Sequence, residues 1–122
     1  MELSTKLYIL SDKGQKFMGA GVLWLLERVE ETGSLLSASR SMGLSYTKAR
    51  AMLEALEENL GRAVLDRKKG GAERSGATLT PFAKEYISLY RDFQSEVKAD
   101  AQKKFEAFSS SVSKLMEEKD EH

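Results

Sequence analysis

The N-terminal third of the chain carries two hydrophobic patterns of different period. An apolar segment within residues 3–10 ends at the polar turn sequence 11–14, so a strand, a turn and a second strand near residues 15–18 are predicted. Residues 22–29 then place apolar side chains three and four positions apart, which is the spacing of one face of an amphipathic helix. Gly33 is the expected end of that helix, because glycine readily adopts the left-handed backbone conformation found there.

Two more helices are predicted between residues 34 and 60, separated by a short turn. Ser34 and Ser45 are each suited to cap a helix, and each precedes apolar side chains at helical spacing. Gly43 lies between the two helices and permits the positive φ that a tight turn requires. Two helices joined in this way are typical of a helix-turn-helix, and Gly61 ends the second one.

The C-terminal half predicts a β-hairpin followed by one long helix. Residues 63–65 and 77–80 are strand candidates on either side of a polar, glycine-rich segment, residues 69–76. Pro81 is favoured at the first position of a helix, and no glycine or proline interrupts the chain from there to about residue 118. Apolar side chains recur along this helix with a mean spacing of about 3.7 residues, which gives a nearly straight stripe.

These elements predict a mainly α fold with a small β-hairpin wing, that is, a winged helix-turn-helix plus a long C-terminal dimerisation helix. We expect the winged helix-turn-helix at residues 1–80, the long helix at residues 81–118 and a frayed tail at residues 119–122. Apolar residues make up 41% of the chain and charged residues 31%, which is a globular balance. The chain has no cysteine, no signal peptide and no apolar run of bilayer length, so we expect a cytoplasmic protein without disulfides or thiolate zinc sites.

Charge is unevenly distributed along the chain. The formal net charge is zero, which by itself argues mildly against a nucleic-acid partner. However, residues 62–74 contain five basic and two acidic side chains, whereas residues 114–122 contain two basic and four acidic ones. Because a polyanion responds to the local field rather than to the total charge, the basic hairpin remains a candidate contact.

The strongest candidate site is the N-terminal part of the helix that follows Ser45. Hydroxyl groups and cations occupy its first turns, whereas its three acidic residues lie toward the other end. This polarity adds to the helix dipole and suits entry of the helix end into the major groove of DNA. The sequence therefore predicts a recognition helix that contacts bases and phosphates. The predicted contacts are Ser45, Tyr46, Thr47, Lys48 and Arg50.

Other interpretations of these residues stay open. A helix-turn-helix is also a common packing motif, in which Lys48 and Arg50 would only be solvated, and Tyr46 equally suits the half-buried edge of a core. The basic side chains of the hairpin are expected to follow phosphates or the minor groove beside the recognition helix, or else to be solvated. They are Arg67, Lys68, Lys69 and Arg74.

The apolar stripe of the long helix predicts self-association. A helix of this length, on the order of 55 Å, extends beyond a core this small, so its large apolar side chains would be exposed in a monomer. We expect a homodimer, which also suits two DNA half-sites about one helical turn apart. The alternative is that the C-terminal third folds back on its own domain or frays. The predicted dimerisation residues are Leu89, Phe93, Val97, Phe105, Phe108 and Val112.

Several motifs together resemble a known family. The segments 33–35, Gly43-Leu44-Ser45-Tyr46, Gly70-Gly71 and Ala77-Thr78-Leu79-Thr80 are similar to the N-terminal DNA-binding domain of the ModE family of molybdate-responsive regulators. That domain is a winged helix-turn-helix related to the LysR type, and the resemblance covers about residues 3–93. It implies DNA binding and dimerisation. By position it places Ser34 against the DNA backbone, the recognition helix from Ser45, and Lys68, Lys69 and Arg74 in the wing.

The chain also departs from this family. The family commonly has tryptophan in place of Arg50, glycine in place of Ala83 and more glycine in the segment 72–75, which affects sequence preference and the wing. Full-length members continue into an oxyanion-binding module, whereas this sequence ends after one helix. We therefore expect a stand-alone domain that does not bind molybdate.

The function expected from the sequence is that of a bacterial-type transcription regulator that binds double-stranded DNA as a homodimer, on an operator with two half-sites. The alternative is a protein–protein interaction module that keeps the winged helix as a scaffold, which the zero net charge and the acidic tail favour. The sequence contains no recognisable nucleophile–base pair, metal cluster or phosphate-binding loop. We therefore expect neither an enzyme nor a bound metal or cofactor, and no membrane partner.

Overall fold

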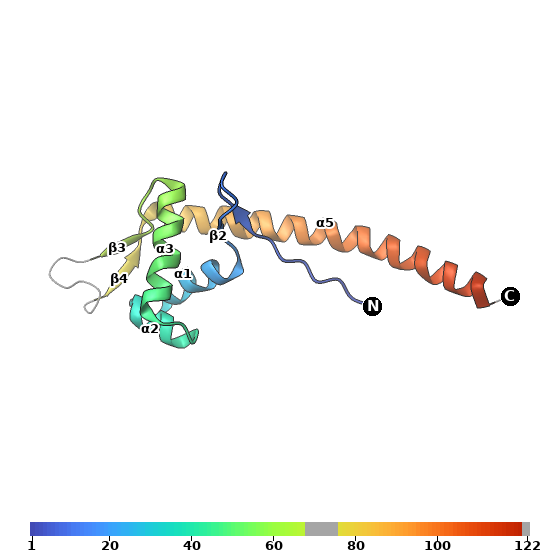
Figure 1. Cartoon of the computed structure of the whole chain (residues 1–122), viewed down its shortest axis with the longest axis horizontal. Helices are drawn as coiled ribbons and strands as arrows, with labels where there is room; N and C mark the ends of the chain where they lie inside the picture. The colour runs from blue at the N-terminus through green and yellow to red at the C-terminus, as the bar shows by residue number, and fades with distance from the viewer. Residues whose placement is uncertain (68–75, 121–122) are drawn as a thin grey trace. The chain divides into compact units, whose positions relative to one another are not determined.

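The computed structural model describes the backbone of residues 1–67 and 76–120 and the side chains of residues 1–66 and 76–118 (Figure 1). The chain divides into two compact units, residues 6–89, and residues 1–5 together with the chain from residue 90 onward. The mainly α fold with small β-hairpins is confirmed. The elements are β1 (Ile9–Leu10), β2 (Lys16–Met18), α1 (Ala20–Thr32), α2 (Leu35–Ser41), α3 (Tyr46–Leu60), β3 (Leu65–Arg67), β4 (Ala77–Leu79) and α5 (Pro81–Asp120).

The predicted N-terminal hairpin is present, with a shorter first strand than the hydrophobic pattern indicated. β1 and β2 pair antiparallel, with Ile9 opposite Met18. Ser11 closes the turn, because its N–H donates to the carbonyl of Gln15 at 2.8 Å and its hydroxyl accepts from the N–H of Lys13 at 3.3 Å. β1 has only two residues, and the pairing register with β2 shifts between Ile9 and Leu10.

The helix α1 forms where the apolar spacing predicted it. Its buried side chains include Leu25, Leu26 and Val29, each 0% exposed. Gly33 ends the helix with a φ of 71°, and its N–H donates to the carbonyl of Val29 at 2.7 Å. The left-handed conformation expected at Gly33 is therefore confirmed.

The core of the unit formed by residues 6–89 lies where α1, α2 and α3 pack together. Ala38 of α2 and Ala49 of α3 are fully buried, and such small side chains let helix backbones approach closely. Leu53 and Leu56 of α3 are also fully buried. Burial of each leucine contributes about 1.5–3 kcal/mol of transfer free energy, so α3 is held firmly by its inner face.

The second hairpin connects α3 to α5. Leu65 of β3 lies opposite Leu79 of β4. The strand β3 begins at Leu65, two residues later than predicted, because the carbonyl of Ala63 accepts a hydrogen bond from the Thr80 hydroxyl at 2.8 Å instead of joining the ladder. The same Thr80 oxygen accepts from the N–H of Ala83 at 3.1 Å, so Thr80 caps α5 as its sequence position indicated.

The helix α5 is the longest element, with 40 residues. Its backbone is helical through residue 120, close to the predicted end at residue 118. No helix within the described part of the chain is both long enough and apolar enough to cross a membrane.

Candidate nucleic-acid interface

The turn between α2 and α3 determines where the second helix begins. Gly43 has a φ of 68°, and its N–H donates to the carbonyl of Arg40 at 3.1 Å. The N–H of Leu44 donates to the carbonyl of Ser39 at 2.9 Å, which completes a Schellman motif at the end of α2. The positive φ predicted for Gly43 is confirmed, and the turn brings the chain directly to Ser45.

The predicted recognition residues lie at the N-cap and in the first two turns of α3. The Ser45 hydroxyl accepts a hydrogen bond from the N–H of Lys48 at 3.1 Å, so Ser45 caps the helix as predicted. Thr47, Lys48 and Arg50 are exposed, whereas Tyr46 is half-buried. The helix therefore presents one hydroxyl group and two cationic side chains to solvent near its N-terminus, and their contact with DNA remains a prediction.

The cationic side chains near the start of α3 differ in their surroundings. The Arg50 Nε lies 2.8 Å from the Glu54 Oε1, and both side chains are about half exposed. Such an (i, i+4) pair in water contributes only about 0.3–0.5 kcal/mol to stability. Another anion can therefore replace Glu54 as the partner of Arg50. Within the described residues, no carboxylate lies at ion-pair distance from Lys48.

Glu57 fixes the C-terminal part of α3 to the second hairpin. Its Oε2 accepts hydrogen bonds from the N–H of Val64 at 2.8 Å and from the N–H of Leu65 at 3.5 Å. Val64 is fully buried, so its N–H depends on this partner. The acidic end of α3 thus has a structural role at the base of the hairpin.

The base of the hairpin is also attached to the turn between α1 and α2. The N–H of Ala77 in β4 donates to the carbonyl of Gly33 at 2.8 Å. Gly76 has a φ of 120°, and a Cβ atom there would lie 3.0 Å from the same carbonyl oxygen, so glycine is required. These two attachments hold the β3–β4 pair beside α3 (Figure 1).

The N-terminus of α2 follows directly after this attachment point. The Ser34 hydroxyl accepts a hydrogen bond from the N–H of Ser37 at 3.2 Å, so Ser34 caps α2 as predicted. The side chain of Ser34 is half-buried. The structure therefore brings together the start of α2, helix α3 and the base of the hairpin. The predicted wing residues Lys68, Lys69 and Arg74 and the side chain of Arg67 lie outside the described residues.

From the sequence, no individual role was predicted for two acidic residues of α3 that have defined contacts in the structure. Glu54 pairs with Arg50, and Glu57 anchors the hairpin. One signal was present for Glu57, because a negative charge in the last turns of a helix is unfavourable with respect to the helix dipole unless it has a partner. That partner lies in a different element, so its identity required the structure.

The predicted dimerisation stripe lies along α5. Leu89 is 70% exposed, Phe93 48% and Phe108 60%. Val97, Phe105 and Val112 are half-buried. The rings of Phe105 and Phe108 contact each other, with centroids 6.5 Å apart and a tilted arrangement. No group of three or more metal-ligating side chains is found among the described residues.

Comparison with known proteins assigns the segment that contains α1, α2 and α3 to a family of helix-turn-helix proteins. A family model described as the bacterial regulatory helix-turn-helix protein, lysR family, matches residues 22–84. This range runs from α1 through α2, α3 and the second hairpin into the first turn of α5.

Two bacterial relatives support the predicted resemblance to ModE-type regulators. The chain is 37% identical over 73 residues to the molybdenum-pterin-binding protein MopB of Rhodobacter capsulatus, a match that covers 60% of this chain and 27% of the relative. It is 30% identical over 92 residues to the molybdenum transport protein ModE of Herbaspirillum seropedicae, which covers 75% of this chain and 32% of the relative. The chain therefore spans between a quarter and a third of the length of these relatives.

A solved structure supports the fold independently. The crystal structure of the CbnR DBD–DNA complex superposes with a TM-score of 0.58 and 21% sequence identity, covering 74% of this chain and 98% of that chain. At this level of identity the likeness establishes the fold. The predicted winged helix-turn-helix architecture is thereby confirmed.

Proposed function

Because the chain belongs to the lysR family of bacterial regulatory helix-turn-helix proteins, we propose that it regulates transcription as a homodimer bound to an operator with two half-sites. The lysR-type helix-turn-helix is a DNA-binding domain. In the proposed complex, α3 lies in the major groove and the start of α2 at Ser34 meets a phosphate. Lys68, Lys69 and Arg74 follow the DNA backbone or the minor groove. A cytoplasmic location is part of this proposal.

The observation that carries the proposal is the exposed polar end of α3. Thr47, Lys48 and Arg50 face solvent in the first turns, and the first acidic residue of the helix is Glu54. The helix dipole adds a partial positive charge at the same end. These groups suit phosphates and guanine edges, which are rich in acceptors.

The dimer is proposed from the stripe on α5. Leu89, Phe93 and Phe108 are at least 48% exposed, and large apolar side chains repeated along one helix are typical of a helix–helix interface. A second copy of this chain is the proposed partner, since a two-fold dimer presents two recognition helices to paired half-sites.

The proposal does not include molybdate binding by residues 1–122. The names of the relatives refer to molybdenum, but the shared segment spans between a quarter and a third of those proteins. The family model matches the helix-turn-helix segment, residues 22–84.

A salt titration of DNA binding tests the proposed function. Fluorescence anisotropy is measured with a labelled duplex from upstream of the protein's own gene. The double variant Lys48→Ala/Arg50→Ala is expected to weaken binding by roughly tenfold or more. It should also reduce the slope of log K against log salt by about 0.9 for each lost phosphate contact.

Lys84→Ala serves as the matched control, because Lys84 is an exposed lysine on α5 outside the proposed contact surface. Unchanged affinity of the double variant would show that α3 does not read DNA. Absence of DNA binding by the wild-type chain at low salt, together with a stable complex with another protein, would favour an interaction module instead.

A further inference from the structure

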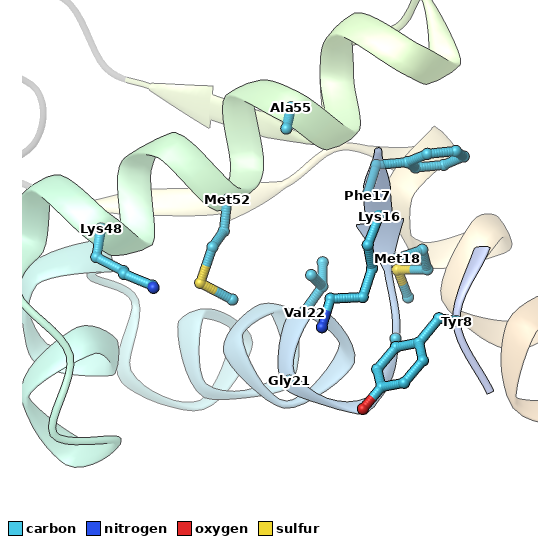
Figure 2. A pocket seen from close by; sticks show the side chains of 10 residues that line it. Tyr8, Lys16, Phe17, Met18, Gly21, Val22, Lys48, Met52 and Ala55 are labelled. Atoms are coloured by element: carbon cyan, nitrogen blue, oxygen red, sulfur yellow. The ribbon is translucent and has the colours of Figure 1, made fainter. Parts of the chain in front are cut away.

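A pocket that the DNA-binding function does not explain lies between the first hairpin and α3. It has a volume of about 280 Å³ and is lined by residues of β2, the start of α1 and α3 (Figure 2). All of these residues belong to the unit formed by residues 6–89. The volume is close to the lower end of the range of small-molecule sites.

The walls of the pocket are mainly apolar. Val22 of α1 and Met52 of α3 line it, together with the ring of Tyr8. The Tyr8 ring packs on Gly19, where a Cβ atom would lie 2.9 Å from the Tyr8 Cδ1. Such walls suit a flat or branched hydrocarbon group, and thioether side chains adapt to its shape.

The polar groups of the pocket are cationic. Lys16 and Lys48 extend from opposite sides toward the space beside Val22 and Met52 (Figure 2). The Lys16 Nζ lies 4.1 Å from the centre of the Tyr8 ring, and no aspartate or glutamate lines the pocket. A bound molecule with one negative charge would therefore find two ammonium groups above an apolar floor.

The start of α1 adds to this positive field. Gly19 precedes the helix and provides no side-chain cap, and the first turn contains no acidic residue. The dipole of a 13-residue helix thus ends at the pocket without a neutralising group from its own sequence.

From this combination we propose that the pocket binds a small organic monoanion with an apolar body the size of one ring, such as an aromatic carboxylate. The ring lies against Val22 and Met52, and the carboxylate lies near the ammonium groups of Lys16 and Lys48. All the residues that line the site in this structure belong to residues 8–55 of this chain.

The pocket is connected to the proposed recognition surface through Lys48. A carboxylate that engages Lys48 neutralises a cation near the start of α3 and withdraws it from DNA. This consequence rests on the proposed function, whereas binding of the anion itself does not. The ligand is thus expected to weaken DNA binding.

Titration of the ¹⁵N-labelled full chain with sodium benzoate tests the site without DNA. Saturable shifts are expected for the amide signals of Gly19, Gly21 and Met52. Benzamide, which has the same shape without the charge, should bind about five- to tenfold more weakly. Absence of saturable shifts, or equal binding of benzamide, would overturn the proposal.

Gly21 provides a variant that fills the pocket without disturbing the fold. A Cβ atom at Gly21 meets nothing within 4 Å, and Gly21 lines the pocket. Gly21→Leu should therefore fold normally and lose benzoate binding, with Gly21→Ala intermediate. Wild-type benzoate affinity in a folded Gly21→Leu protein would contradict the assignment of the site.

A pair of charge variants completes the test. Lys16→Gln should weaken benzoate binding about two- to fivefold, while Lys13→Gln, on the same hairpin but outside the pocket, should not. Equal effects of the two variants would argue against a specific contact with Lys16.

DNA anisotropy in the presence of benzoate separates the two proposals. Benzoate should raise the Kd for DNA in the wild-type chain and not in Gly21→Leu. If the chain binds benzoate but no DNA, the proposed function fails and the pocket remains. If it binds DNA but shows no saturable benzoate shifts, the pocket fails alone.

Discussion

Arg50 shows how one exposed side chain can exchange partners. In the free chain its Nε lies 2.8 Å from a carboxylate oxygen of Glu54, with both groups in contact with water. A phosphate or a guanine edge offers a charge-assisted or bidentate contact that competes well with such a pair. The ion pair thus orients Arg50 without preventing its use in recognition.

Replacement of Glu54 tests this interpretation. Glu54→Gln removes a negative charge from the proposed contact surface and breaks the ion pair between Glu54 and Arg50, so DNA affinity should rise by about two- to fivefold at low salt. Anisotropy at two salt concentrations measures the gain, which should shrink at the higher one. Glu58→Gln, an exposed carboxylate further along α3, is the control. A weaker complex with Glu54→Gln would show that Glu54 holds Arg50 in its productive position.

The second hairpin depends on the helices that hold its base. β3 and β4 have three residues each, and an isolated hairpin of this size is not stable in water. Its attachment comes from the Glu57 carboxylate and from the carbonyl of Gly33. Both attachments connect the hairpin to the ends of helices, so the position of the β3–β4 pair follows from helix packing.

Glu57→Ala should destabilise the fold by about 1–3 kcal/mol, because the buried N–H of Val64 loses its acceptor. Denaturant unfolding followed by circular dichroism measures the change. Glu58→Ala removes a neighbouring charge near the same helix end without breaking a hydrogen bond, so its effect should stay within about 0.5 kcal/mol. If the helix dipole were the main effect, both variants would be slightly stabilising instead.

At the scale of the whole molecule, self-association decides whether two recognition helices act together. The exposed stripe on α5 includes Phe93 and Phe108, and solvent contact of such large apolar side chains is unfavourable. In the proposed homodimer these side chains are covered by a second copy. The affinity for DNA then increases, because two linked domains bind two half-sites at once.

The double variant Phe93→Glu/Phe108→Glu should weaken the dimer by at least roughly a hundredfold, since two apolar contacts become charged. Sedimentation velocity over a concentration series measures the change, and DNA affinity should fall in parallel. Lys98→Glu, an exposed polar position on the same helix, should leave the assembly intact. A wild-type chain that sediments as a monomer at all concentrations would contradict the proposed dimer.

Local signals in the sequence were sufficient to predict the helices and the residues at which they begin and end. Ser34, Ser45 and Thr80 cap helices, and Gly33 and Gly43 take a positive φ, because these properties depend on backbone groups only a few residues away. The same signals placed the polar start of α3, which is the centre of the candidate site.

Contacts between distant segments depended on packing. The bond from Ala77 to Gly33 and the bond from Val64 to Glu57 join different elements, and no spacing rule relates their positions. The pocket likewise needs Lys16 and Lys48 on facing elements. Caps and turns follow from local backbone chemistry. These contacts between distant residues follow instead from how the buried faces of α1, α2 and α3 pack together.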